Sequence, residues 1–202
     1  GGEEGHDITG TYTFDFTSSL TNAWAIAAVV LRPIANAQVT TQAATSITSS
    51  GATLNGNITD IGSSNVTVRG FDYGLTTAYG SNTSQSGSYG TGTYGLSVSS
   101  LSPGTTYHFR AYVQNSEGWS YGSDLTFTTT ATAPTVTTQA AGGLGPNAAT
   151  LNGNITADGG ATIDIRGFDY GLTAGYGSSA TESGSFSTGT FQQGLTGLAP
   201  ST

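Results

Sequence analysis

Residues that could carry out acid–base or nucleophilic chemistry are few in this chain of 202 residues. His6 and His108 are the only histidines, and there is no cysteine. Neither histidine belongs to a serine, cysteine or carboxylate motif of the kind that activates a nucleophile. We therefore expect no catalytic residues, no cofactor and no enzymatic activity.

One short stretch has the residue types of a metal site. The sequence EEGHD brings together Glu3, Glu4, His6 and Asp7, and carboxylate oxygens are the ligands that hard cations prefer. Their spacing corresponds to no metal-binding loop. We expect a solvated acidic terminus and no bound metal.

The charge of the chain limits its partners. The formal net charge is −8, and all four cations are arginines. Without a basic patch to neutralise phosphates, nucleic acid and anionic membrane surfaces are poor partners. The apolar run AWAIAAVVL has nine residues, well short of the ~20 that span a bilayer, so we expect no membrane insertion.

Aromatic side chains offer a different chemistry, because their faces can stack on sugar rings. Trp119 is the best candidate for a ligand contact, since it lies at the expected tip of a hairpin and loops carry function. Surface glycans are the expected ligand class. Many of the tyrosines recur at domain spacing, which favours packing. The N-x-[ST] pattern of N-glycosylation occurs at Asn57, Asn65, Asn82 and Asn154.

The elements that must position these residues belong to an internal sequence repeat that occurs twice. Five segments recur at one constant offset, without insertion, and the period is that of a small domain. The matched segments are 39–43 with 136–140, 52–59 with 149–156, 69–76 with 166–173, 87–94 with 184–191, and 101–105 with 198–202.

Alternating patterns within the repeat predict β-strands. In TYHFRAYV, residues 107, 109, 111 and 113 share one face, and His108, Arg110 and Tyr112 share the other. In NVTVRGFDYG the alternation slips between Val68 and Phe71, and the intervening Gly70 suggests a β-bulge there. Short strands separated by Gly-rich turns favour an all-β fold of tandem β-sandwiches.

The first repeat resembles a fibronectin type III-like, immunoglobulin-like domain of microbial surface proteins. The matching pattern L-x-P-G-T-x-Y is formed by Leu101, Pro103, Gly104, Thr105 and Tyr107, and Asn115 and Gly118 match its last hairpin. The resemblance covers 39–130 fully and 136–202 partly, and implies that Tyr107 is a tyrosine corner. We expect three parts: an N-terminal β-hairpin (1–38), a complete sandwich (39–131) and an incomplete one (132–202).

The second repeat has no counterpart of residues 106–130, which we expect to form the last two strands. The lost inward side chains correspond to those of Tyr107, Phe109, Ala111, Leu125 and Phe127. Their absence costs on the order of 10 kcal/mol, comparable with the ~5–15 kcal/mol that stabilises a whole domain. We therefore expect the second repeat to need another segment to complete it.

Residues 9–34 have the pattern of such a segment, and a head-to-tail exchange of strands would build a filament. The donor residues would be Tyr12, Phe14, Phe16, Trp24, Ile26, Ala28 and Val30. The acceptor groove would be lined by Leu151, Ile155, Ile163, Ile165, Phe168, Tyr170 and Leu198.

Two interpretations of the whole chain are open. It is either a structural subunit of an extracellular filament, with neighbouring copies as its partners, or an adhesive or glycan-binding module cut from a longer surface protein. In the second case the N-terminal hairpin is the tail of an upstream domain. Both place the chain outside the cell.

Overall fold

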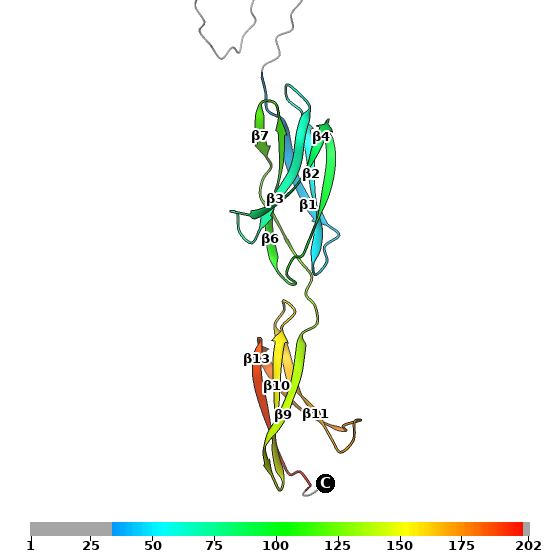
Figure 1. Ribbon diagram of the computed structural model, residues 1–202, viewed down its shortest axis with the longest axis vertical. Helices are drawn as coiled ribbons and strands as arrows, with labels where there is room; N and C mark the ends of the chain where they lie inside the picture. Colours follow the sequence, from blue (N-terminus) through cyan, green and yellow to red (C-terminus); the bar gives the residue numbers. More distant parts are fainter. Residues whose placement is uncertain (1–33, 200–202) are drawn as a thin grey trace, which may run out of the picture. The chain divides into compact units, whose positions relative to one another are not determined.

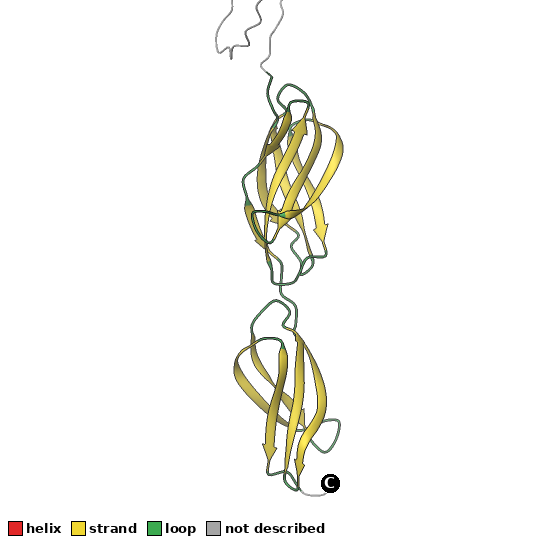
Figure 2. Cartoon of the chain, turned by 60° about the vertical axis from the view of Figure 1, so that its left-hand side comes forward, coloured by secondary structure: helices red, strands yellow, loops and turns green. Residues whose placement is uncertain are grey.

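The computed structural model describes residues 34–199, which form thirteen strands and no helix (Figure 2). Every strand pair is antiparallel, and each lies within one or the other repeat. None of the described segments is a helix long and apolar enough to cross a membrane. The expected all-β fold is confirmed. The expected N-terminal hairpin lies outside the described residues.

The first repeat forms two sheets, in the order β1-β2-β5 and β4-β3-β6-β7, and β8 also pairs with β6 (Figure 1). The strands are β1 (Gln38–Thr45), β2 (Gly51–Asp60), β3 (Val66–Gly74), β4 (Gly80–Tyr89), β5 (Gly92–Ser99), β6 (Thr106–Asn115), β7 (Gly118–Tyr121) and β8 (Leu125–Thr128).

Up to residue 199, the second repeat has counterparts of the first five of these strands. One sheet has the order β13-β10-β9, and the other contains β11 and β12. The strands are β9 (Thr135–Gly145), β10 (Ala148–Ala157), β11 (Ile163–Tyr170), β12 (Ser178–Phe186) and β13 (Gly189–Thr196).

The core of the first sandwich lies between its two sheets. Leu54 and Ile58 on β2 meet Phe71 on β3 and Phe109 on β6, and all four side chains are fully buried. Burying each such side chain contributes roughly 1.5–3 kcal/mol. Because Phe109 lies on β6, the core depends on β6 as well as on the strands that both repeats possess.

Strand β6 follows the alternation that the sequence predicts. Tyr107, Phe109, Ala111 and Val113 are all buried in the core. The Tyr107 hydroxyl accepts a hydrogen bond from the Ser102 amide at 2.9 Å, so the ring closes on backbone five residues upstream, as in the tyrosine corner of sandwich domains.

The bulge in β3 does not lie at Gly70, where the sequence pattern suggested it. The register shifts between Val66 and Val68, and from Val68 onward β3 pairs regularly with both neighbours. A glycine is required at position 70 for a different reason, because a Cβ there would lie 2.6 Å from the Tyr112 ring. The glycine makes room for an aromatic ring to lie over the strand. The second repeat has the same shift, between Ile163 and Ile165.

The hairpin between β6 and β7 is fixed by a buried polar side chain. The Asn115 amide group donates to the carbonyls of Ala35 (3.1 Å) and Ile61 (3.0 Å), and its oxygen accepts from the amides of Glu117 and Gly118. Gly118 has a φ of 144°, a region that favours glycine. The predicted match of Asn115 and Gly118 to a hairpin is confirmed.

A buried tyrosine links stability to alkaline pH. The Tyr94 hydroxyl donates to the carbonyls of Gly70 and Tyr112, at 3.2 Å each, and burial raises its pKa above the ordinary value. The folded state thus favours the neutral phenol. Its contribution to stability is present below pH ~10, the unfolded pKa, and is lost as pH rises above it.

We expect the free energy of unfolding to fall from about pH 10 upward, with a shallower fall in Tyr94→Phe, which has no phenol to ionise. Urea denaturation between neutral pH and about pH 11 measures this. Identical slopes for the variant and the unsubstituted protein would show that Tyr94 does not cause the fall.

Candidate functional site

Strand β3 is paired along both edges, whereas its counterpart β11 is paired along one. β3 lies between β4 and β6, and Asp72, for example, is opposite Asn82 on one side and Arg110 on the other. β11 pairs with β12 alone among the strands of residues 34–199. Its second edge therefore presents backbone N–H and C=O groups that can accept another strand.

The core face beside this edge is also incompletely covered. The buried core of the second repeat consists of Ile155, Ile163 and Phe191, with Phe168 and Phe186 partly buried against them. Val136 is 59% exposed, whereas its counterpart Val39 is 8% exposed. In the first sandwich β1 packs against β6, β7 and β8, so the second repeat is open where those three strands would lie.

The structure places the predicted acceptor residues as follows. Ile155 and Ile163 are buried, and four others are half-buried: Leu151, Phe168, Tyr170 and Leu198. Ile165 is 62% exposed. It follows the register shift and lies three residues from Phe168, which puts it on the opposite face of β11. Its assignment to the groove was wrong, because the sequence did not locate the shift.

The predicted donor residues all lie outside the described residues: Tyr12, Phe14, Phe16, Trp24, Ile26, Ala28 and Val30. Their role stays a prediction.

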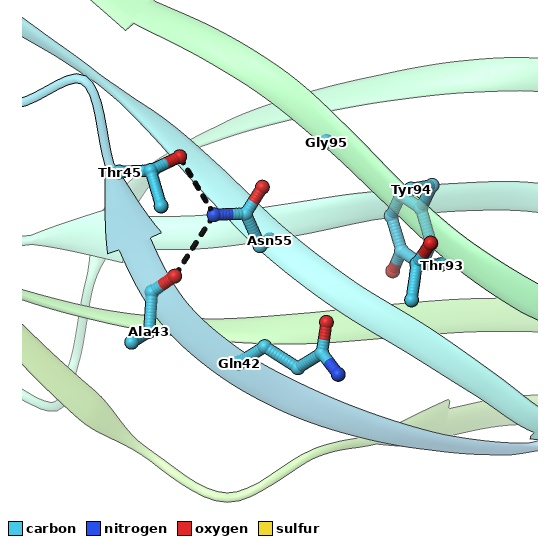
Figure 3. Close-up of a pocket in the computed structure, with 7 residues that line it drawn as sticks. All are labelled: Gln42, Ala43, Thr45, Asn55, Thr93, Tyr94 and Gly95. Atoms are coloured by element: carbon cyan, nitrogen blue, oxygen red, sulfur yellow. Dashed lines mark hydrogen bonds between the residues drawn. The ribbon is translucent and has the colours of Figure 1, made fainter.

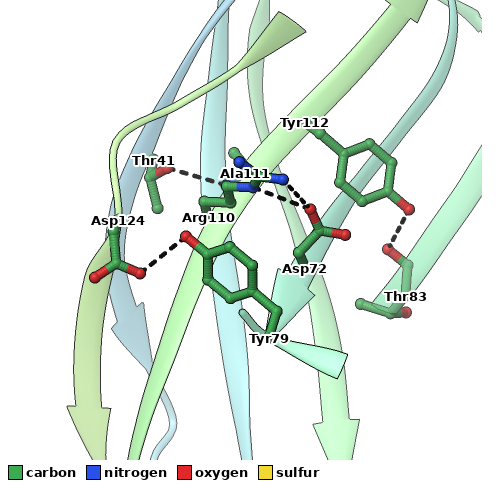
Figure 4. A network of polar contacts seen from close by, with 8 residues as sticks. All are labelled: Thr41, Asp72, Tyr79, Thr83, Arg110, Ala111, Tyr112 and Asp124. Atoms are coloured by element: carbon green, nitrogen blue, oxygen red, sulfur yellow. Dashed lines mark hydrogen bonds and ion pairs between the residues drawn. The ribbon is translucent and has the colours of Figure 1, made fainter. Parts of the chain in front are cut away.

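In the first sandwich, β6 covers the edge of β3 that corresponds to the open edge of β11. Arg110 on β6 is the centre of the side-chain contacts made there (Figure 4). Its guanidinium pairs with Asp72 on β3 at 3.0 Å and stacks 4.9 Å from the Tyr79 ring centre and 4.0 Å from that of Tyr121. The Tyr79 hydroxyl donates to Asp124 at 3.0 Å. Burial, and then this hydrogen bond to the carboxylate, raise the pKa of Tyr79.

Two further contacts join β6 to the strands that both repeats share. The Ala111 amide donates to Thr41 Oγ1 on β1 at 3.0 Å. Ala111 lies between the stretches of β6 that pair with β7 and β8, so it has no ladder partner on the edge opposite β3. The Tyr112 ring covers Gly70, and its hydroxyl donates to the Thr83 carbonyl at 3.4 Å. Burial raises the pKa of Tyr112.

The second repeat keeps one side of each of these contacts. Asp169, Tyr176, Thr138 and Gly167 stand where Asp72, Tyr79, Thr41 and Gly70 stand in the first. Tyr176 even keeps the unusual positive φ, 53° against 58° at Tyr79. Within the part of the chain that the structure describes, none of the four has the corresponding partner. The open edge of β11 is thus accompanied by side chains whose counterparts contact β6 in the first sandwich, as well as by unpaired backbone groups.

A second candidate surface lies on the outer face of the sheet β4-β3-β6-β7. Asp72, Asn82, Tyr112, Trp119 and Tyr121 line a depression of about 310 Å³ there. Trp119 is the second residue of β7, and its role as a ligand contact stays a prediction. The sequence did not single out Asp72 or Asn82 as its neighbours, because only the strand register brings them together.

Another depression, of about 640 Å³, lies over β1, β2 and β5 (Figure 3). It forms where the β1 register shifts between Gln42 and Thr45. The Asn55 amide group fills the irregularity by donating to the Ala43 carbonyl at 2.8 Å and to Thr45 Oγ1 at 3.0 Å. Asn152 does the same for Ala140 in the second repeat. We assign these asparagines a structural role.

The outward-facing His108 has one close partner. Its Nδ1 lies 2.8 Å from Asp124 Oδ2, a pair that the sequence did not predict. Among residues 34–199, no three His, Cys, Asp or Glu side chains gather closely enough to hold a metal ion. The stretch containing Glu3, Glu4, His6 and Asp7 lies outside that range.

Asn57, Asn82 and Asn154 lie on strands, and Asn65 lies in the loop directly before β3. Asn65 and Asn82 are exposed, and Asn57 and Asn154 are half-buried. The Asn65 amide group donates to Ser88 Oγ at 2.9 Å. Glycosylation at these positions stays a prediction.

No protein-family model matches the chain, and no curated protein is found as a relative. Among solved structures, it is similar to the sensor domain of the anti-sigma factor RsgI4 of Pseudobacteroides cellulosolvens, in a short and a long version. The identities are 20% and 21%, and the TM-scores 0.40 and 0.37. Each match covers 48% of this chain, and 97% and 92% of the respective sensor-domain chains. A likeness of this degree carries no information about function.

The open edge leads to a prediction for hydrogen exchange. In the unassembled chain, where no donor strand covers the edge, we expect the β11 amides that correspond to β6-bonded β3 amides to exchange at least about 100-fold faster than those β3 amides, because their N–H groups have no strand partner. Hydrogen exchange followed by NMR resolves the two strands. Equal protection in β3 and β11 would mean that another segment covers this edge in solution.

Proposed function

We propose that the chain is a non-enzymatic structural subunit of an extracellular filament, built from fibronectin type III-like sandwiches and assembled by strand complementation. The observation that carries the proposal is the open edge of β11, next to a half-covered core. An antiparallel hairpin added there completes the sheet, covers Val136 and Phe168, and reproduces the packing of the first sandwich. Main-chain hydrogen bonds supply affinity in such strand addition, and side-chain pockets supply specificity.

The proposed donor is the segment of residues 9–34 of a neighbouring copy. Tyr12, Phe14 and Phe16 alternate as core-facing residues of β6 do. Because donor and acceptor are at different parts of the chain, the contact is heterologous, and repeated head-to-tail addition that does not close into a ring makes a filament.

The alternative that the sequence left open is a module of a longer surface protein, in which a hairpin of the same polypeptide occupies the edge. In that case a hairpin with the same side-chain pattern pairs with β11, but it belongs to the same polypeptide rather than to a neighbouring copy. A solution of the chain would then contain no assemblies held by residues 9–34. Measurement of assembly separates the two.

We expect Phe14→Asp to abolish assembly, because it places a carboxylate in the apolar core that the donor must complete. Analytical ultracentrifugation and electron microscopy measure the assembly. Phe14→Leu is the matched control and keeps it. The NMR signals of the first sandwich should be unchanged in both variants. Filaments of normal length from Phe14→Asp would contradict the proposal.

Charge at the edge tests the register of the donor. Aligning GTYTF with TTYHF puts Tyr12 and Phe14 in the places of Tyr107 and Phe109, and Asp15 in the place of Arg110. Arg110 is opposite Asp72 in the ladder, so Asp15 would face Asp169. Directly opposed like charges destabilise a strand pair.

Asp15→Arg is therefore expected to tighten assembly, by several-fold or more at low ionic strength, because it recreates the Arg110–Asp72 arrangement. Sedimentation at two salt concentrations measures this, with Asp15→Asn as the control for loss of charge alone. Unchanged or weaker assembly in Asp15→Arg would exclude this register.

A further inference from the structure

The aromatic depression on the outer face of the first sandwich is separate from the open edge of β11. Its floor is Tyr112, which is only 7% exposed, while Trp119 and Tyr121 are 45% and 49% exposed. Asp72 and Asn82 complete the lining. Its volume of about 310 Å³ is at the lower end of the ~300–1,000 Å³ typical of small-molecule sites.

The rings that line it are held in place by protein contacts. Tyr112 meets Trp119 edge-on, with ring centres 5.5 Å apart and planes at 69°, and lies 6.3 Å from Tyr121. The Arg110 guanidinium stacks 4.0 Å from the Tyr121 ring centre and is itself held by Asp72. Such preorganised rings lose little conformational entropy when a ligand binds.

We propose that this depression binds a neutral saccharide, with one or two pyranose rings in contact. The apolar C–H face of a pyranose stacks on Trp119 or Tyr121, and its rim of hydroxyls faces Asp72 and Asn82. Arg110 engages only Oδ2 of Asp72. Among the described contacts, Asp72 Oδ1 and the side-chain amide group of Asn82 have no protein partner, so both can hydrogen-bond sugar hydroxyl groups when Asn82 carries no glycan.

The charges around the depression select neutral ligands. Arg110 is the cation of this cluster, and it is paired with Asp72. Asp124 adds a further carboxylate beside Tyr79. With a net charge of −8 for the chain, an anionic polysaccharide meets repulsion and finds no unpaired guanidinium there.

The polar groups also favour a sugar over a proline-rich peptide, the other ligand class that aromatic grooves bind. An ionised carboxylate only accepts hydrogen bonds. A polyproline segment has no backbone N–H to offer to Asp72 Oδ1, whereas every sugar hydroxyl is a donor.

The second repeat is an internal control. Asp169 and Ser179 stand at the positions of Asp72 and Asn82. No described residue of that repeat takes the place of Tyr112, Trp119 or Tyr121, since all three lie on β6 and β7. The saccharide site belongs to the first sandwich, and Asn82→Ser reproduces the residue of the second.

The test is a titration of the full chain with neutral oligosaccharides: cellotetraose, xylotetraose, mannotetraose and galactotetraose. NMR reads out the indole N–H of Trp119, assigned with Trp119→Phe, and calorimetry gives the affinity. We expect at least one probe to shift this signal. Trp119→Ala should weaken its binding about tenfold or more, a loss of about 1.4 kcal/mol, whereas Trp119→Phe keeps most of it. Asn82→Ser should weaken it several-fold.

Three results would overturn the proposal: no shift with any neutral probe at millimolar concentration, equal affinity in Trp119→Ala, or a shift produced only by a decaproline peptide or by polygalacturonate. Amide signals of the β2 core residues confirm that each variant is folded. If Trp119→Ala perturbs β7, Tyr121→Ala gives the same test. Assembly should be unchanged in these variants, so the saccharide site and the filament proposal succeed or fail separately.

Discussion

The pairing of β3 with β6 is the interaction on which the first sandwich depends. β6 brings four buried side chains to the core and pairs with three strands, β3, β7 and β8. A strand in the middle of a sheet must satisfy its backbone groups along both edges, because unpaired groups cost free energy or attract another chain. In the second repeat, the described residues meet this requirement on one edge of β11 only.

Arginine side chains make many of the side-chain contacts between neighbouring strands. Arg110 combines an ion pair with two aromatic stacks, and Arg69 lies 3.9 Å from the Tyr89 ring centre while Gln85 accepts its hydrogen bonds. Arg166 repeats that arrangement with Phe186 and Glu182. The planar guanidinium can pair within its plane and stack on its faces at once, which lysine cannot do.

The hairpin formed by β6 and β7 contributes to two separate surfaces. The inner face of β6 fills the core, and the outer face of β6 and β7 carries Tyr112, Trp119 and Tyr121. Among the described residues no such hairpin pairs with β11, and there neither the core cover nor the aromatic face is present. The proposed filament contact therefore concerns the inner face, and the proposed saccharide site the outer one.

Local patterns predicted much of the fold but misplaced one detail with consequences. The alternation of β6 assigned its buried and outward residues correctly, because side chains of a regular strand alternate between faces. The same rule failed at β3, where the shift lies between Val66 and Val68. The position of a bulge depends on the opposing strand, β4, and the error carried Ile165 into the predicted groove. The sequence also did not show that the last strand divides into β7 and β8.

By itself, the sequence determined the repeat, the strands, most of the core and the lack of a second hairpin in residues 132–202, since these follow from short-range patterns and from comparison of the chain with itself. Only the tertiary structure decided which side chains meet. Arg110 and Asp72 are 38 residues apart. Asn82 on β4 and Trp119 on β7 line the same depression although β3 and β6 lie between their strands. Such partners depend on strand order and register, which are set by the packing of the whole sheet rather than by any local stretch.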